Sequence, residues 1–230
     1  MGLWTARDNM WQAAMVVYAV DVGSIAQGNF AWARVARSTD APEDTSGDDI
    51  RDLVEAVSAD LRQGRRVALG FECPVFIPVR DVPARLTAKR LGEGNRPWSA
   101  GAGTGALATG LAQSVYVLRK LREAAEETGF HITPTLAAAQ FVAGEANLLL
   151  WEAFVSGKDK TRSHVGDAQA VARLCLHRLG AGGAQSDIGG DGDVLSLMGA
   201  ALVRSGLSQA VALLSQPCLV VNLGEAGSTP

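Results

Sequence analysis

The stretch Met15-Val-Val-Tyr-Ala-Val-Asp21 is the most informative for the fold, because it is a continuous apolar run that ends in a carboxylate. An unbroken run of this length predicts a strand buried on both faces, which is typical of a sheet covered by helices on either side. Two further runs have the same design: Val67-Ala-Leu-Gly-Phe71 precedes Glu72, and Leu148-Leu-Leu-Trp151 precedes Glu152. Because an uncompensated carboxylate is costly in such a setting, we expect these acids to have a function.

The composition indicates one enzyme-sized domain covering residues 1–230. With 47% apolar residues the chain can bury a large core. A net charge of −3 does not indicate a nucleic-acid binder, so an anionic partner would have to be held locally. No apolar run has the length of a membrane span, and no signal peptide is recognisable. Three cysteines without a CxxC pair fit a reducing compartment, so we expect a cytoplasmic protein without membrane contact.

The first half of the chain predicts a strand hairpin followed by a helical crossover. Residues 29–36 read as a second strand, antiparallel to the first because the connection is short. Residues 38–47 read as a loop. Residues 48–62 have the apolar spacing of an amphipathic helix, and a strand follows at 66–72. The helix supplies the crossover that allows this strand to lie parallel to strand 15–21.

The second half predicts further α/β structure and a glycine-rich connection. The run Ser99-Ala-Gly-Ala-Gly-Thr-Gly105 fails the context tests for a dinucleotide or Walker loop and is interpreted as a mobile loop. Residues 180–192 read as a flexible connection, and residues 193–230 form a C-terminal extension. The other predicted elements are helix 106–128, a short helix at 135–143, strand 146–154, helix 164–179, two helical pieces and strand 218–222.

Asp167 lies near the start of the predicted helix 164–179. Val171 and Leu174 follow at spacings that place all three side chains on one face, so Asp167 is expected to point toward the sheet. His164 is on the same side. The alternative is an acid favoured near a helix N-terminus, where the macrodipole makes it worth ~0.3–1 kcal/mol.

Together these residues resemble the ribonuclease H-like superfamily. The resemblance rests on Val20-Asp21-Val22-Gly23 with Gly28 downstream, on Glu72, and on His164-Val-Gly-Asp167-Ala168. The last motif is similar to the His-x-x-Asp-Ala signature of Holliday-junction resolvases. Glu72-Cys73-Pro74, Glu152 and Asp167-Ala168 are similar to motifs of an uncharacterised prokaryotic family of predicted nucleases. The resemblance covers residues 15–178, although no third antiparallel strand is recognisable in the chain.

The resemblance implies an α/β fold with a mixed sheet ordered 3-2-1-4-5 and helices on both faces. It implies a nuclease that hydrolyses phosphodiester bonds with two Mg²⁺ or Mn²⁺ ions held ~4 Å apart. By this resemblance Asp21, Glu72, Glu152 and Asp167 would be the metal ligands. Such oxygen ligands suit these cations. His164 or Lys158 would orient the water or the phosphate. A homodimer is among the states that the sequence allows.

A basic segment follows Glu72 directly and is a candidate for binding DNA or RNA. It contains Arg80, Arg85, Lys89, Arg90 and Arg96, with Trp98 beside it. The cations would contact phosphates and the indole would stack on a base. An ordinary solvated basic loop is the alternative.

Two other functions stay open at this point. The first is a non-catalytic protein of the same fold that binds nucleic acid or another protein. The second is an ATP-binding protein of the actin and sugar-kinase type, with Asp21-Val-Gly23-Ser24 as its phosphate loop. Proteins of that type need two copies of the domain, whereas this chain has room for about one.

Overall fold

A mixed β-sheet forms the centre of the molecule. The computed structural model describes residues 15–36, 44–95, 97–155, 160–161, 163–182, 185–190 and 192–225. Within these residues the sheet has seven strands in the order β3-β2-β1-β4-β7-β6, and β9 also pairs with β7. An α/β fold with a mixed, mostly parallel sheet is therefore confirmed.

The N-terminal strands form an antiparallel meander. β1 (Met15–Asp21) pairs with β2 (Ala31–Ala36), and the short helix η1 (Ile25–Gln27) lies in the connection. β2 then pairs with β3 (Thr45–Gly47). The prediction that residues 38–47 form a loop is therefore wrong for residues 45–47, which form β3. β3 has only three small polar residues, too few for a strand pattern to be visible in the sequence.

The remaining strands of this sheet are all parallel to β1. They are β4 (Arg66–Phe71), β7 (Leu148–Phe154), β6 (Pro134–Thr135) and β9 (Leu219–Asn222). β6 and β9 share one edge of β7, because β4 occupies the other edge. The sheet thus continues past the fifth strand that was expected. The C-terminal segment contributes β9 to this sheet, so it is integrated in the core rather than appended to it.

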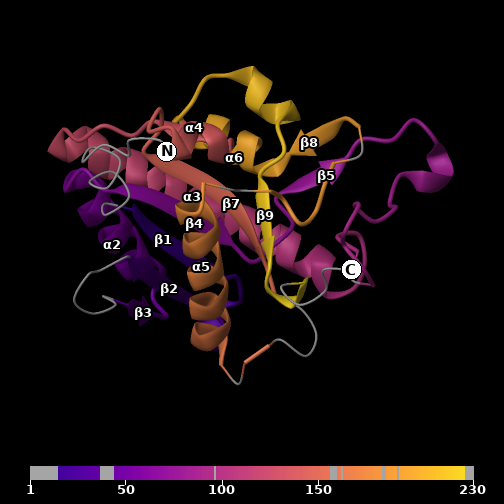
Figure 1. The fold of residues 1–230 in the computed structure, drawn as a ribbon, viewed down its shortest axis with the longest axis horizontal. Coiled ribbons are helices and arrows are strands. Elements are labelled where there is room, and N and C mark those ends of the chain that lie inside the picture. Colours follow the sequence, from indigo (N-terminus) through magenta and orange to yellow (C-terminus); the bar gives the residue numbers. More distant parts are fainter. Residues whose placement is uncertain are drawn as a thin grey trace, which may run out of the picture.

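Helices cover both faces of the sheet, as expected from the buried strands (Figure 1). Alternate residues of β1 face opposite sides. Val16, Tyr18 and Val20 join a core with α2 (Ile50–Arg62), α3 (Ala102–Thr128) and α6 (Leu197–Ser205). Val17 and Ala19 join a second core with α4 (Ala138–Val142) and α5 (His164–Gly180). The glycine run predicted as a mobile loop instead opens α3, which begins at residue 102.

A buried ion-pair network fixes α2 to the sheet. Asp60, which is 3% exposed, accepts hydrogen bonds from Tyr18 Oη at 2.6 Å, Arg34 Nε at 2.8 Å and Arg65 Nη1 at 2.7 Å. These donors satisfy a carboxylate that burial would otherwise destabilise. The network is therefore structural.

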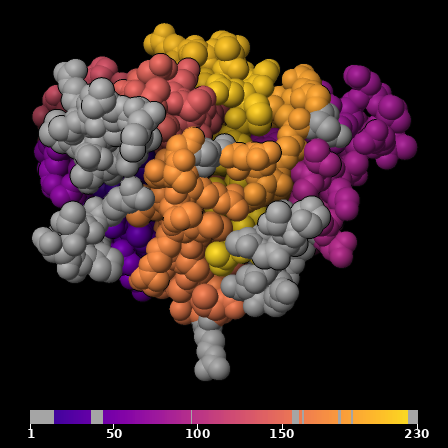
Figure 2. Space-filling view, in the orientation of Figure 1, coloured from indigo at the N-terminus to yellow at the C-terminus, as the bar shows by residue number. Residues whose placement is uncertain are grey.

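A small second sheet lies beside the main one. β5 (Phe76–Pro78) pairs with β8 (Val194–Ser196), and the short helix η2 (Pro83–Arg85) follows β5. The segment from β5 toward α3 projects from one side of the molecule, where Figures 1 and 2 show it in magenta. The short helices η4 (Val211–Ser215) and η5 (Leu223–Glu225) flank β9. Among the helices described, none has the length and apolar character that a membrane span requires.

Candidate functional site

Two carboxylates lie side by side where β1 and β4 end. Val20 pairs with Phe71, and Glu72 N donates to Val20 O at 2.7 Å, so Asp21 and Glu72 are the next neighbours across the strands. Neighbouring strands are about 4.8 Å apart, and residues in register on parallel strands share a face. The alternation along β1 directs Asp21 to the face covered by α5. The predicted convergence of these two acids is therefore found.

The start of α5 adds His164 and Asp167 to this region. Ser163 caps the helix by accepting a hydrogen bond from Gly166 N at 3.1 Å. His164 Nδ1 lies 2.5 Å from Asp21 Oδ2. Asp167 is 4% exposed and accepts a hydrogen bond from the backbone N–H of Thr161. Its predicted inward direction is confirmed.

The negative charge of the Glu72 carboxylate is poorly compensated by its neighbours. Lys160 Nζ lies 3.6 Å from Glu72 Oε1, while Glu72 Oε2 is buried and has no hydrogen-bond partner among the described residues. Burial, together with the charge of Asp21, raises the pKa of Glu72 to about 8. Burial also raises the pKa of Asp21, although the hydrogen bond from His164 opposes the shift. A cation bound between the two carboxylates would stabilise their ionised forms.

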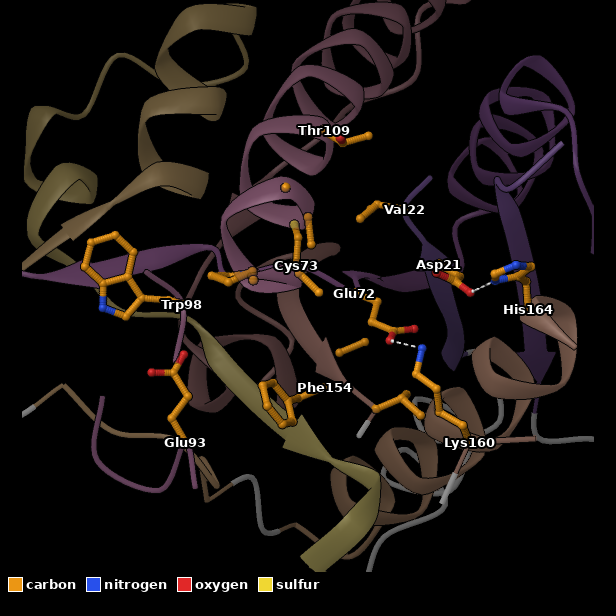
Figure 3. A pocket seen from close by; sticks show the side chains of 17 residues that line it. Asp21, Val22, Glu72, Cys73, Glu93, Trp98, Thr109, Phe154, Lys160 and His164 are labelled. Atoms are coloured by element: carbon orange, nitrogen blue, oxygen red, sulfur yellow. Dashed lines mark hydrogen bonds and ion pairs between the residues drawn. The ribbon is translucent and has the colours of Figure 1, made fainter. Parts of the chain in front are cut away.

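These side chains face a cavity of about 380 Å³. Asp21, Glu72, Lys160 and His164 line one part of it, and the dashed lines in Figure 3 mark their two ion pairs. The other lining residues are Val22 after β1, Glu93, Trp98, and residues of the loop after β4, the end of β7 and the first turns of α3. A pocket with a few converging polar groups is a typical binding or active site.

Glu152 does not belong to this site. Its carboxylate accepts hydrogen bonds from Arg90 Nη1 and Nη2, both at 2.7 Å, and from Val75 N at 3.0 Å. The side chains of Glu152 and Arg90 are both 0% exposed. Trp151 and Ala153 belong to the core beneath α5, so the alternation of β7 turns Glu152 to the opposite face. The structure therefore contradicts the prediction that Glu152 is a metal ligand.

The basic segment is divided between core and surface. Arg90 is 1% exposed and also pairs with Glu93 at 3.0 Å, so the prediction that it contacts nucleic acid is wrong. Arg85 and Lys89 are exposed, and Arg80 is half-buried, but none of the three lines the cavity. Trp98 does line it. Arg96 and Lys158 lie outside the described residues, and their predicted roles stay predictions.

Sequence reasoning missed two contributors to the cavity. Lys160 was not among the predicted site residues, because nothing in the local sequence distinguishes it from Lys158. The glycine-rich start of α3 forms one wall of the cavity. Its small side chains were the available signal, because a wall of small residues leaves room for a ligand.

The acids do not form a complete metal-binding site. In the part of the chain that the structure describes, no three His, Cys, Asp or Glu side chains are placed to hold one ion. Comparisons with protein-family models, with curated proteins and with solved structures found no match to this chain. Function must therefore be argued from the site itself.

Proposed function

We propose that the protein is a metal-dependent phosphodiester hydrolase, a nuclease, with Asp21 and Glu72 as ligands of a Mg²⁺ or Mn²⁺ ion. One observation carries the proposal: two neighbouring carboxylates face a cavity, and no described residue provides a hydrogen-bond partner for the buried Glu72 Oε2. A relationship to the ribonuclease H-like superfamily is part of the same proposal.

The donor set fits one cation better than the expected pair. Carboxylate oxygens are the ligands that Mg²⁺ and Mn²⁺ prefer, and Asp21 and Glu72 provide them from adjacent strands. Asp167 is close enough to influence the pKa of both acids, but it is not placed to share an ion with them. Glu152 is unavailable because Arg90 occupies its carboxylate. The expected set of four ligands for two ions is thus reduced to two acids, Asp21 and Glu72, for one ion.

A divalent cation at this place would polarise the phosphoryl oxygen and make a water molecule more acidic. The chain's own residues would act around it. Lys160, with its side chain 42% exposed, can contact a phosphate oxygen at the cavity. Asp21 orients the imidazole of His164 through Nδ1, which leaves Nε2 to accept or donate a proton.

The experiment is hydrolysis of labelled single-stranded DNA, duplex DNA and RNA with Mg²⁺, Mn²⁺ or EDTA. We expect cleavage only with a divalent ion, and loss of at least about 100-fold in rate for Asp21→Asn and for Glu72→Gln. Glu55→Gln makes the same acid-to-amide change on the exposed surface of α2 and should leave the rate unchanged.

Cleavage in EDTA, or equal rates for all four proteins, would contradict the proposal. Nucleic-acid binding without cleavage would instead favour the non-catalytic alternative. ATP binding would favour the kinase-like alternative, although the described residues contain one such central sheet and not two.

A further inference from the structure

The cavity has a second, chemically different part beyond the two acids. Figure 3 shows Trp98 and Glu93 at one side, His164 and Asp21 at the other, and Cys73 with Glu72 between them. The proposed hydrolysis explains the acidic part and leaves the part beside Trp98 without a role. The question is which ligand group would occupy it.

Trp98 is held as a fixed aromatic wall. Its Nε1 donates to Ala88 O at 3.1 Å, and the neighbouring Ser99 Oγ donates to Thr87 O at 2.6 Å. An aromatic ring that is already positioned loses little conformational entropy when a planar ligand stacks on it. Its six-membered and five-membered rings offer a surface comparable with that of a nucleobase.

The first turns of α3 pack against the loop that carries Trp98 and leave the neighbouring part of the cavity open. A Cβ on Gly103 would lie 2.6 Å from Pro97 O, so only glycine allows α3 to approach this loop. A Cβ on Gly105 would meet no atom within 4 Å, so the cavity beside it is free. Ala102 and Ala106 also line the cavity with small side chains. The first turns of α3 thus leave room for a flat ligand.

The surroundings favour a ligand that carries phosphate. Lys89 and Arg85 are exposed outside the cavity, on the segment that holds Trp98 through Thr87 and Ala88, and Lys89 Nζ also donates to Gly94 O at 2.9 Å. Exposed cations beside an aromatic platform are the usual means of binding a single strand. Lys160 provides another cation at the acidic part of the cavity.

We propose that the part of the cavity beside Trp98 binds one unpaired nucleobase, which stacks on the indole while its phosphodiester reaches Asp21 and Glu72. A base enters such a pocket only when it is out of the helical stack. The substrate class is therefore a single strand, a strand end or an extruded nucleotide, rather than a continuous duplex. The substrate class rests on the proposed hydrolysis, whereas base binding stands independently of it.

The test is titration with adenosine in EDTA, followed by calorimetry, with ribose 5-phosphate as the sugar-phosphate control. We expect adenosine to bind and ribose 5-phosphate not to bind. Trp98→Leu should weaken adenosine binding about tenfold or more, and Trp98→Phe, which keeps an aromatic ring, should retain most of it. Glu55→Gln, on the exposed surface of α2, should bind adenosine like the wild type.

Gly105→Leu gives a second approach that does not depend on Trp98. The backbone of Gly105 is not in the left-handed region, and a Cβ added there would meet open space. The variant should therefore fold, and its leucine side chain should fill the cavity. We expect it to melt no lower than the wild type and to lose adenosine binding. Absence of adenosine binding by the wild type, or equal binding by Trp98→Leu and Gly105→Leu, would overturn the proposal.

Oligonucleotide cleavage separates this proposal from the previous one. A single strand should be cut faster than the same strand in a duplex. An abasic position next to the scissile bond should raise KM in the wild type but not in Trp98→Leu. Cleavage without adenosine binding would overturn only the base site, and adenosine binding without cleavage would overturn only the hydrolase.

Discussion

Replacing Glu152 by Gln distinguishes a core ion pair from a metal ligand. Glu152 receives three hydrogen bonds, two of them from Arg90, and both side chains are 0% exposed. Removing one partner of a buried ion pair typically costs about 3–5 kcal/mol, because the other charge remains buried. Glu93 stays next to Arg90 and keeps part of the compensation, so we expect about 3 kcal/mol. For a chain of this size that corresponds to a fall in melting temperature of roughly 6–12 °C.

The assay is urea and thermal unfolding with and without Mn²⁺. The variant should be destabilised, yet it should gain as much stability from added Mn²⁺ as the wild type does. A triple variant, with Arg90→Met, Glu93→Gln and Glu152→Leu, should recover much of the loss, because it leaves no buried charge unpaired and replacing a buried ion pair by neutral groups is often neutral or stabilising. A Glu152→Gln protein within about 1 kcal/mol of wild type that no longer responds to Mn²⁺ would refute the assignment.

Three further changes test other parts of the structure. Glu72 has a pKa of about 8 against an ordinary 4.5, so the folded protein holds a proton that the unfolded chain has lost. Without metal, stability should therefore fall as the pH rises from about 5 to 8, by roughly 1.4 kcal/mol per unit, and Glu72→Gln should flatten the urea-unfolding profile. Asp21→Asn removes a carboxylate whose pKa burial raises, so its melting temperature without metal should equal or exceed that of wild type; a clearly lower one would indicate a structural role. Gly70→Ala should destabilise by about 1–3 kcal/mol, because the new Cβ would lie 2.2 Å from the ring of Trp151; unchanged stability would contradict the β4–β7 register.

The central strands β1, β4 and β7 and the position of Asp21 and Glu72 were predictable from the sequence. Each apolar run is continuous, which predicts burial on both faces, and each ends in an acid. Parallel strands bring their carboxyl ends to one edge of the sheet. Asp167 was predictable as well, since its helical spacing to Val171 defines the buried face of α5. These features depend on local pattern alone.

The role of Glu152 depends on register, which local pattern does not reveal. A shift of one residue along a strand moves a side chain to the other face of the sheet. Glu152 pairs with Phe71, one position short of Glu72, and so points away from Asp21. Its partner, Arg90, comes from a segment with no regular structure. No sequence spacing links the two residues.

The glycine run at the start of α3 was misread for a different reason. Glycine is a poor helix former, so propensity favours a loop there. The helix nevertheless includes Gly103, and glycine is needed there because a side chain would clash with Pro97 O. Tertiary contact overrides local preference at this point. The same residues then form the wall of the cavity.

Binding of Mn²⁺ at pH 7 tests the central claim most directly. Calorimetry in buffers of different ionisation enthalpy would measure both affinity and proton release for the wild type, Glu72→Gln and Glu55→Gln. Because the pKa of Glu72 is about 8, binding should release roughly one proton in the wild type and in Glu55→Gln. Glu72→Gln should bind at least tenfold more weakly and release fewer protons. Wild-type protein that binds no Mn²⁺, or a Glu72→Gln variant that binds it equally well, would contradict the account.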